Sequence, residues 1–351
     1  MRAESPVRYG ILGFGNHGMR RLVPGFALAK ASVLHGIWRR DAKKAEAIAR
    51  DLNLPCCFAN AEELCASPEI DVVFVTSPDA LHRPHVLLAL RAGKAVLCEK
   101  PLGMNAGEVE EMLAAAKHAQ VQFGVAQNFR FSHSLRLIRE WIAEGRIGKP
   151  VLAGAQFCYD AAQVPRAWIY NPEVACGGPI GDVGIHCLDA LRFVLDDDVN
   201  SVATVATSDA KSGQVESNAS IGLAFSKGTV GSVTVTARAP FRYTLVEVVG
   251  DEGVVKCENC LNVDHPVEVV WLRDGKVAEQ HQVSNSDAYG MMIDAFSAAF
   301  HGTEIYSASG EDGLRNQRIL DAAYTSLRQG QTQQLVTSSP QYNKSPHRQD
   351  G

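Results

Sequence analysis

The chain of 351 residues lacks the features of membrane-spanning, secreted and nucleic-acid-binding proteins. No apolar run approaches the ~20 residues that a membrane-spanning helix requires, and the first residues lead into a predicted strand without the apolar region of a signal peptide. Positive charge is not in excess either, because the formal net charge is -5. General attraction to nucleic acid or to anionic lipid is therefore not expected. We expect a cytoplasmic protein that binds neither.

The chain also lacks an even number of cysteines, since it contains nine. Several of them, including Cys98, Cys158 and Cys187, lie in apolar or strand-like segments, where a free cysteine behaves as a small hydrophobic residue. The pair Cys257-x-x-Cys260 could form a metal or redox pair, but no second pair of ligands follows at the spacing of a zinc site. We expect reduced thiols and no metal site.

The length of the chain exceeds what one hydrophobic core usually supports, so two domains are expected. Residues 1–130 alternate apolar strands with helical segments, which predicts an α/β domain with a doubly wound parallel sheet. Residues 131–330 turn to alternating β-branched stretches, which predict an α+β domain with an open, mostly antiparallel sheet. Residues 331–351 are rich in Gln, Ser and Pro, and we expect this tail to be mobile.

The first domain is organised around three glycines, Gly13, Gly15 and Gly18, which follow a short apolar strand in the spacing G-x-G-x-x-G. In a dinucleotide-binding turn the first glycine allows the bend, the second lets the backbone approach a pyrophosphate, and the third lets the helix pack on the strand. The spacing alone would also suit a plain structural turn. We predict that the whole turn contacts a dinucleotide: Gly13, Phe14, Gly15, Asn16, His17 and Gly18.

The end of the second predicted strand favours NADP(H) over NAD(H). An acidic residue about 20 positions after the glycines would accept hydrogen bonds from the adenosine ribose, whereas an arginine there accommodates a 2′-phosphate. Arg39 and Arg40 occupy this place, and no carboxylate lies between Gly18 and Asp41. The planar guanidinium suits phosphate. The alternative is that the two arginines cap a strand end in solvent.

Further candidates follow the other predicted parallel strands, because ligands of open parallel sheets bind beyond the carboxyl ends of the strands. A lysine at such an end, Lys100 after the strand at 95–98, is a candidate for chemistry. The cofactor-binding residues predicted from these strand ends are Thr76, Pro78, His82, Glu99, Lys100 and Asn128.

A second group of polar residues lies in the glycine-rich segment 176–191. Asp182, His186 and Asp189 are spaced i, i+4, i+7, so on a helix they would share one face. An imidazole titrates near neutral pH and can exchange a proton with a hydroxyl, and a nearby carboxylate can orient it or bind substrate. The alternative is a core histidine that is satisfied by a neighbouring aspartate.

Four motifs, in this order, are similar to those of the Gfo/Idh/MocA oxidoreductases, the family of glucose-fructose oxidoreductase and inositol 2-dehydrogenase. They are Gly13-x-Gly15-x-x-Gly18, Glu99-Lys100-Pro101, Gln127-Asn128-Phe129-Arg130 and Asp182-x-Gly184-x-His186, and the resemblance covers residues 7–330. It implies a Rossmann domain followed by a mixed open-faced sheet that often serves oligomerisation, here as a homodimer or homotetramer. It also implies that Lys100 binds the reacting oxygen, that His186 is the acid/base and that Asp182 positions substrate or histidine. Many members carry an acidic residue where this chain has Arg39, which puts NAD use in doubt.

We therefore predict an NADP(H)-dependent oxidoreductase, with NAD(H) as the alternative cofactor, that acts on a hydroxyl or carbonyl carbon of a sugar, polyol or related cyclic alcohol. Among the candidates for substrate binding, Arg130 and Arg166 could equally form surface ion pairs, and Trp168 could be a packing residue. The resemblance also admits a nicotinamide-dependent glycosidase and a non-catalytic sugar-sensing regulator. The predicted substrate-binding residues are Arg130, Tyr159, Arg166, Trp168, Asp182, His186 and Asp189.

Overall fold

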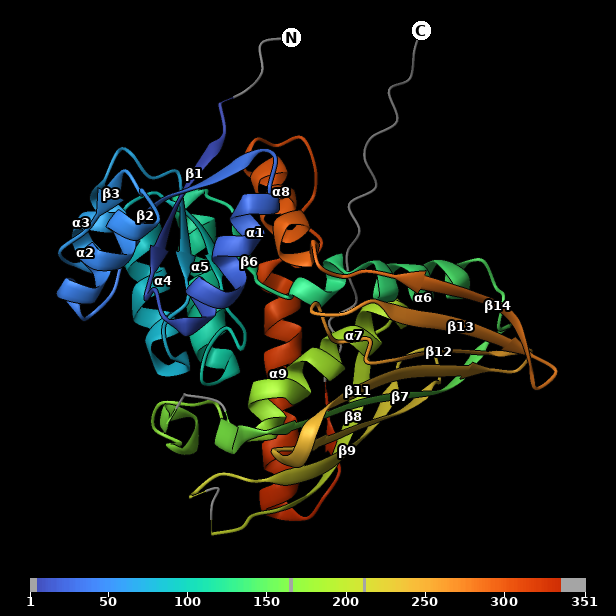
Figure 1. The fold of residues 1–351 in the computed structure, drawn as a ribbon. Coiled ribbons are helices and arrows are strands. Elements are labelled where there is room, and N and C mark those ends of the chain that lie inside the picture. The colour runs from blue at the N-terminus through green and yellow to red at the C-terminus, as the bar shows by residue number, and fades with distance from the viewer. Residues whose placement is uncertain (1–4, 164–166, 211–212, 336–351) are drawn as a thin grey trace, which may run out of the picture.

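The computed structural model describes residues 5–163, 167–210 and 213–335. Within these residues the chain forms a six-stranded sheet and a nine-stranded sheet, which lie side by side with the long helix α9 (Gly310–Gln329) between them (Figure 1). This arrangement confirms the predicted fold class, an α/β domain followed by a domain with an open sheet. No helix in the described ranges is both long enough and apolar enough to cross a membrane.

The first sheet is parallel throughout and has the strand order β3-β2-β1-β4-β5-β6, which is the order of a doubly wound dinucleotide-binding sheet. The order reverses between β1 and β4, so a crevice opens beyond the carboxyl ends of these two strands. The strands are β1 (Val7–Leu12), β2 (Ser32–Trp38), β3 (Cys56–Cys57), β4 (Val72–Val75), β5 (Ala95–Cys98) and β6 (Phe123–Val125).

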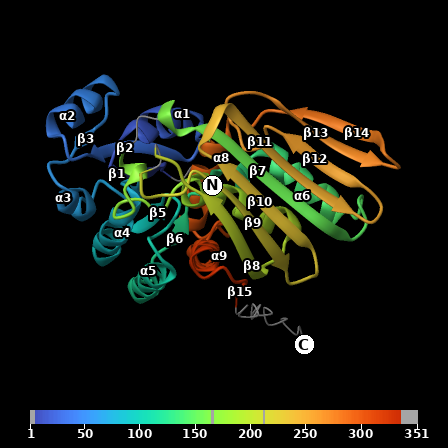
Figure 2. The same ribbon diagram turned by 90° about the horizontal axis from the view of Figure 1, so that it is seen from below.

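Helices cover both faces of this sheet (Figures 1 and 2). Side-chain caps fix where several of them begin: Asp41, Asn60 and Asn105 each accept a hydrogen bond from the amide three residues later. The helices are η1 (Gly18–Leu22), α1 (Val23–Leu28), α2 (Ala42–Asp51), α3 (Ala61–Ala66), η2 (Asp79–Leu81), α4 (His82–Arg91) and α5 (Ala106–Ala119).

Helix α8 (Ala288–Phe300) returns from the second half of the chain to the first sheet. Its residues Ile293 and Phe296 are fully buried in the core of that sheet, and Ile293 O accepts a hydrogen bond from the Tyr9 hydroxyl at 3.1 Å. The segment 131–330, which the sequence assigned to the second domain, therefore contributes a helix to the packing of the first.

The second sheet has the order β14-β13-β12-β11-β7-β10-β9-β8-β15 and is antiparallel except between β7 and β10. Inward and outward residues alternate along β7, where Ala153, Ala155 and Phe157 are buried. Its strands are β7 (Pro150–Asp160), β8 (Val199–Thr207), β9 (Asn218–Phe225), β10 (Val230–Thr236), β11 (Arg238–Gly250), β12 (Val254–Glu258), β13 (Val267–Arg273), β14 (Lys276–Val283) and β15 (Gln333–Gln334).

The buried face of the second sheet packs on helices, and its other face carries none from the described part of the chain (Figure 2). Strand β15 pairs with β8, so residues 333–334 of the predicted tail are ordered into the sheet edge. The rest of that tail, from residue 336, lies outside the described residues. The remaining helices are η3 (Asn128–Phe131), α6 (His133–Ala143), η4 (Ala161–Gln163), η5 (Ala167–Tyr170), η6 (Ile180–Gly184) and α7 (Ile185–Leu195).

The Cys257 and Cys260 thiols are free, fully buried members of the second core. The neighbouring Cys260 thiol, and next burial, raise the pKa of Cys257, so this thiol stays protonated. Among the described residues, no group of three or more His, Cys, Asp and Glu side chains is arranged to hold a metal ion.

Candidate active site

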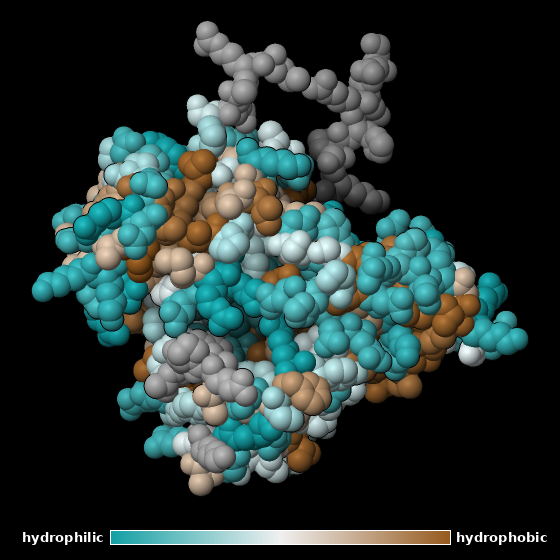
Figure 3. All heavy atoms as spheres, in the orientation of Figure 1, coloured by the Kyte–Doolittle hydropathy of each residue, from teal (hydrophilic) through white to brown (hydrophobic). Residues whose placement is uncertain are grey.

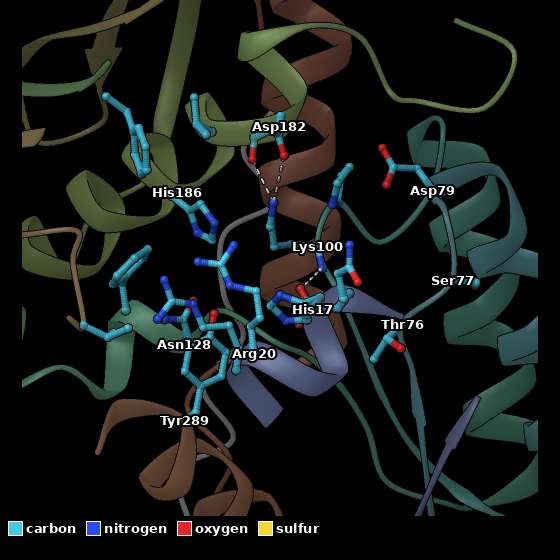
Figure 4. Close-up of a pocket in the computed structure, with 18 of the residues that line it drawn as sticks. His17, Arg20, Thr76, Ser77, Asp79, Lys100, Asn128, Asp182, His186 and Tyr289 are labelled. Atoms are coloured by element: carbon cyan, nitrogen blue, oxygen red, sulfur yellow. Dashed lines mark hydrogen bonds and ion pairs between the residues drawn. The ribbon is translucent and has the colours of Figure 1, made fainter. Parts of the chain in front are cut away.

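A pocket of about 360 Å³ lies beyond the carboxyl ends of the first sheet's strands, where they face the second domain (Figure 4). On the face drawn in Figure 3, hydrophilic residues gather at this junction. The pocket is lined by Asn16, His17, Arg20, Arg21, Thr76, Ser77, Asp79, His82, Glu99, Lys100, Pro101, Asn128, Phe129, Phe157, Trp168, Asp182, Val183, His186, Arg242, Val263 and Tyr289.

The glycine turn between β1 and η1 has the geometry of a phosphate cradle. Gly13 has a φ of +93°, and a Cβ there would lie 2.8 Å from the Ser77 amide nitrogen, so only glycine fits. At Gly15 the nearest atom to an added Cβ is 3.8 Å away, which leaves the backbone open to a ligand. The helix begins at once, and no side chain caps it at His17. Its first amides are therefore available to phosphate oxygens, and the turn fits a dinucleotide.

The same turn is tied to the end of β2. The amides of Gly13 and Phe14 both donate to Trp38 O, at 3.0 and 2.9 Å, which brings the turn beside Arg39 and Arg40. Neither arginine forms a hydrogen bond or ion pair with another described residue, and neither lines the pocket itself. Phe14 is buried and packs against Gly18, so its side chain serves the core.

Lys100 and Asp182 meet across the two domains. Lys100 follows β5, and its Nζ donates to Asp182 O at 2.7 Å and lies 3.7 Å from Asp182 Oδ1. The Tyr159 hydroxyl donates to Asp182 Oδ2 at 2.9 Å. Figure 4 shows the ammonium group of Lys100 entering the pocket between Asp182 and His186. An ammonium has three N–H donors, so donor capacity remains for a ligand oxygen.

His186 faces the pocket from the first turn of α7. Its Nδ1 is buried and has no hydrogen-bond partner among the described residues, whereas its ring lies edge-on to Phe129 at 4.9 Å between centroids. Burial, and next the positive charge of Lys100, hold the pKa of His186 well below its ordinary value. The imidazole is therefore neutral near pH 7 and can accept a proton.

The loop that carries Asp182 is fixed by one buried carboxylate, that of Glu216. Its oxygens accept hydrogen bonds from the amides of Gly178 and Ile180, at 3.1 and 2.9 Å, and from the Tyr324 hydroxyl at 3.0 Å. A Cβ at Gly178 would collide with Glu216 O at 2.1 Å, which explains the glycine. Glu216 thus holds the chain just before Asp182.

His17 and Glu99 connect the glycine turn to β5, since His17 Nε2 lies 2.8 Å from Glu99 Oε1. Burial alone would raise the pKa of Glu99, but the neighbouring His17 and Lys100 outweigh it, so this pKa lies below its ordinary value. Glu99 is therefore an anion within the pocket wall, and it lies beside His17 and Lys100.

The loop after β4 contributes Thr76, Ser77 and Asp79. Thr76 Oγ1 donates to Gly13 O at 3.1 Å, and Asp79 Oδ2 accepts from the Cys176 amide at 2.9 Å. Burial raises the pKa of Asp79. His82 is buried with its ring nitrogens 2.7 and 2.8 Å from the carbonyl oxygens of Pro101 and Ser77, so it links two pocket loops.

Arg130 and Asp189, which the sequence assigned to substrate binding, lie elsewhere. They form a buried ion pair in which Arg130 Nη2 and Asp189 Oδ1 are 2.7 Å apart, and neither lines the pocket. Asn316 donates to the same carboxylate at 2.7 Å. The geometry argues against the predicted role, because both charges are already satisfied inside the protein.

The other predicted residues divide between the pocket and its support. Trp168 and Asn128 line the pocket, and Asn128 Nδ2 is buried without a partner in the described structure. Tyr159 acts on the pocket through Asp182. Pro78 lies in the loop after β4 but does not line the pocket. Arg166 lies outside the described residues.

Several pocket residues were not predicted. Asp79 follows a parallel strand, so the rule that selected Lys100 could have found it. Arg20 lies on η1, directly after the glycine turn, and lines the pocket from there. Arg242 on β11 and Tyr289 on α8 come from distant segments, and no local pattern marks them.

The family of the chain follows from two sequence models. One, described as "Oxidoreductase family, NAD-binding Rossmann fold", matches residues 7–127, and the other, described as "GFO/IDH/MocA C-terminal domain", matches residues 135–256. The chain belongs to the GFO/IDH/MocA oxidoreductases. This membership confirms the resemblance seen in the four motifs and makes the glycine turn part of an NAD-binding Rossmann domain.

Relatives in the GFO/IDH/MocA family match nearly the whole chain. The 1,5-anhydro-D-fructose reductase of Ensifer adhaerens is 31% identical over 334 residues, 94% of this chain and 99% of the relative. The D-xylose 1-dehydrogenase (NADP(+)) 2 of Haloferax volcanii is 27% identical over 332 residues, 94% and 100% of the two chains. The crystal structure of the aldose-aldose oxidoreductase of Caulobacter crescentus, complexed with glycerol, superposes with a TM-score of 0.86 at 23% identity, over 94% of this chain and 100% of that one. This likeness shows the shared fold.

Proposed function

We propose that the protein transfers a hydride between NADP(H) and a hydroxyl or carbonyl carbon of a sugar, polyol or related cyclic alcohol. The observation that carries the proposal is the convergence of Lys100 and His186 on one pocket beside the glycine turn. The names of the relatives, a reductase of 1,5-anhydro-D-fructose and a dehydrogenase of D-xylose, support this substrate class.

The cofactor would be held by the turn at 13–18 and by the loops after β4 and β5. When bound, its nicotinamide would supply or accept the hydride. Thr76 fixes the turn, and the free Asn128 Nδ2 offers a hydrogen-bond donor on the pocket wall. His17 and Glu99 hold the turn against β5, so the two cofactor-binding segments keep their spacing.

The chain's own residues would handle the oxygen and its proton. Lys100 would donate a hydrogen bond to the substrate oxygen and stabilise negative charge that grows on it, an effect of about 3 kcal/mol in comparable sites. His186, neutral because of its low pKa, would take the hydroxyl proton during oxidation and return it during reduction. Asp182 would keep Lys100 in place through the contacts described above.

The preference for NADP(H) rests on the end of β2. Arg39 and Arg40 form no hydrogen bond or ion pair with a described residue, and they follow Trp38, whose carbonyl oxygen accepts from the amides of the glycine turn. Asp41 is the nearest carboxylate, but its side chain caps α2 by accepting from the Lys44 amide at 3.1 Å. A 2′-phosphate would find two guanidinium groups here, whereas a ribose hydroxyl would find no free carboxylate.

We also propose a homodimer or homotetramer that forms through the helix-free face of the second sheet. Leu152 on β7 and Val230 on β10 are paired across neighbouring strands, and each is more than half exposed. Val205 on β8 is 73% exposed. Exposed apolar residues on one sheet face are typical of a subunit contact.

A panel of sugars and polyols, offered with NADP and with NAD and followed at the reduced-nicotinamide absorbance near ~340 nm, tests this function. We expect reduced cofactor to accumulate with at least one substrate, and faster with NADP. Turnover of a glycoside without net absorbance change would instead identify a nicotinamide-dependent glycosidase. Binding of a sugar without any turnover would identify a sugar-sensing regulator, and equal or better use of NAD would contradict the assignment of Arg39 and Arg40.

A further inference from the structure

Two arginines of the pocket, Arg20 and Arg242, have no carboxylate partner in the described structure. Arg20 lies on η1 and forms no hydrogen bond or ion pair with a described residue, although it lines the pocket. Arg242 lies on β11, and its Nη2 donates only to a backbone oxygen, Leu261 O, at 2.6 Å. Both side chains therefore retain most of their donors and their full charge.

The carboxylates at the pocket already accept hydrogen bonds from other groups of the protein. Asp264, which follows the pocket residue Val263, accepts two hydrogen bonds from Arg21, of 2.5 and 2.9 Å. Glu99 Oε1 lies 2.8 Å from His17 Nε2. Asp182 accepts from the Tyr159 hydroxyl and faces Lys100. Asp79, the remaining carboxylate of the lining, is buried and accepts from the Cys176 amide at 2.9 Å. The two guanidinium groups therefore remain without a carboxylate partner and can bind an anionic ligand.

Both arginines lie on the side of the pocket where the substrate would react. Figure 4 shows the Arg20 side chain extending from η1 toward His186 and Lys100. The Arg242 guanidinium lies 4.8 Å from the centroid of Phe157, and the Phe157 ring is stacked with that of His186 at 6.4 Å. The two cations thus flank the acid/base residue, one from each domain.

We infer that the substrate carries an oxyanion, a carboxylate or a phosphate ester, which Arg20 and Arg242 bind together. The inference rests on the proposed function and narrows its substrate class from sugars and polyols to their acids or phosphates. A guanidinium matches both oxyanions through paired hydrogen bonds. Because the chain as a whole has a net charge of -5, this local positive field would also favour anions at this site over the rest of the surface.

The phosphates of the cofactor are a second source of oxyanions, but other groups are placed to bind them. The free amides of the glycine turn would take the pyrophosphate, and Arg39 would take the 2′-phosphate. Arg242 belongs to β11, a strand of the second domain, whereas the cofactor-binding loops belong to the first. The two sources predict different effects of substitutions at Arg20 and Arg242. Such substitutions would weaken the binding of NADPH only if the two arginines bound the phosphates of the cofactor.

The test compares substrates that differ only in the group attached at one position, which is neutral or anionic. Glucose, glucuronate and glucose 6-phosphate carry a hydroxyl, a carboxylate and a phosphate on C6, and the galactose series and a cyclic polyol with its monophosphate extend the comparison. We expect kcat/KM to be higher for one anionic member than for the neutral member of its series. Added salt should lower kcat/KM for the anionic substrate but not for the neutral one. A preference for the carboxylate or for the phosphate identifies the oxyanion.

The variants Arg20→Gln and Arg242→Gln should each lower kcat/KM for the anionic substrate by roughly 10- to 100-fold, the loss of a charged hydrogen bond. The neutral member should change little. Arg20→Lys and Arg242→Lys should recover part of the loss, because they keep the charge. Arg50→Gln, which removes an exposed arginine of α2 outside the pocket, is the matched control.

Two results would overturn the inference. One is a neutral substrate that is used as well as its anionic partner, and the other is an NADPH dissociation constant that rises in both variants as much as the substrate KM. If no sugar is turned over, the proposed function fails. The change in melting temperature on adding an anionic sugar then still tests whether the two arginines bind an oxyanion. With NADP bound, an anionic sugar should stabilise the wild type but not Arg20→Gln, and equal stabilisation of the two would contradict it.

Discussion

Replacing Arg130 by Met should destabilise the protein while leaving substrate binding intact. The Arg130 and Asp189 side chains are only 6% and 3% exposed, and Arg130 Nε lies 3.0 and 2.9 Å from the two Asp189 oxygens. Arg130 also donates to Ser307 O and lies 3.4 Å from Asp312. The variant would leave the Asp189 carboxylate in the interior with Asn316 as its remaining donor.

Breaking one partner of a buried ion pair costs about 3–5 kcal/mol, and we expect this loss for Arg130→Met. Asp189→Asn should cost less, about 1–3 kcal/mol, because Arg130 keeps Asp312 and a carbonyl partner. The double variant Arg130→Met/Asp189→Leu should lose less than the sum of the single changes, since it removes both charges.

Urea unfolding of the full chain, followed by circular dichroism, measures these losses as a lower midpoint at an unchanged slope. Steady-state kinetics on the same proteins should give a substrate KM close to that of the wild type wherever the variant is folded. If Arg130→Met kept its stability within about 1 kcal/mol and raised the substrate KM tenfold, the reasoning would be refuted. Arg130 would then bind substrate, as the sequence predicted.

Three further predictions address the preference for NADP, the proton transfer by His186 and the loop before Asp182. Arg39→Ser should raise KM for NADP by roughly 10- to 100-fold and leave KM for NAD unchanged in steady-state assays, because it removes a charged hydrogen bond to the 2′-phosphate. Since His186 has a lowered pKa and must be neutral to accept a proton, the acidic fall of kcat/KM for oxidation should lie below about pH 6.5, the ordinary value for histidine; a fall at or above that pH would argue against His186 as the base. Glu216→Gln should lower the free energy of unfolding by about 1–3 kcal/mol and also lower kcat, because the loop before Asp182 loses a charged acceptor; a change in stability alone would leave Glu216 without a positioning role.

Local patterns were sufficient for most of the fold. The alternation of apolar strands and helical segments in residues 1–130 predicted the parallel sheet, and side-chain caps such as Asn105 fix where its helices begin. The antiparallel sheet followed from period-2 alternation. Local patterns could not show that α8 packs on the first sheet, since an apolar helix fits either core and only the tertiary arrangement decides.

The candidate site was predictable where chemistry follows a strand end or a glycine turn, as for Lys100. The helical spacing failed for Asp189 for a geometric reason. Residues 180–184 form a π-helical turn, which holds more residues than an α-helical turn, so the assumed common face with Asp182 does not continue into α7. Asp189 turns inward to Arg130 instead. The sequence could not predict that Arg242 lines the pocket, because its position there depends on the pairing of β11 with β7.

The claim that Lys100 and His186 carry out the chemistry can be tested most directly with Lys100→Met. The measurement is single-turnover reduction or oxidation on a confirmed substrate, together with the dissociation constant of NADPH. We predict a loss of about 10²–10³ in the rate of the chemical step, as for removal of one oxyanion-stabilising donor, with little change in NADPH affinity. A rate within a few-fold of the wild type would contradict the account.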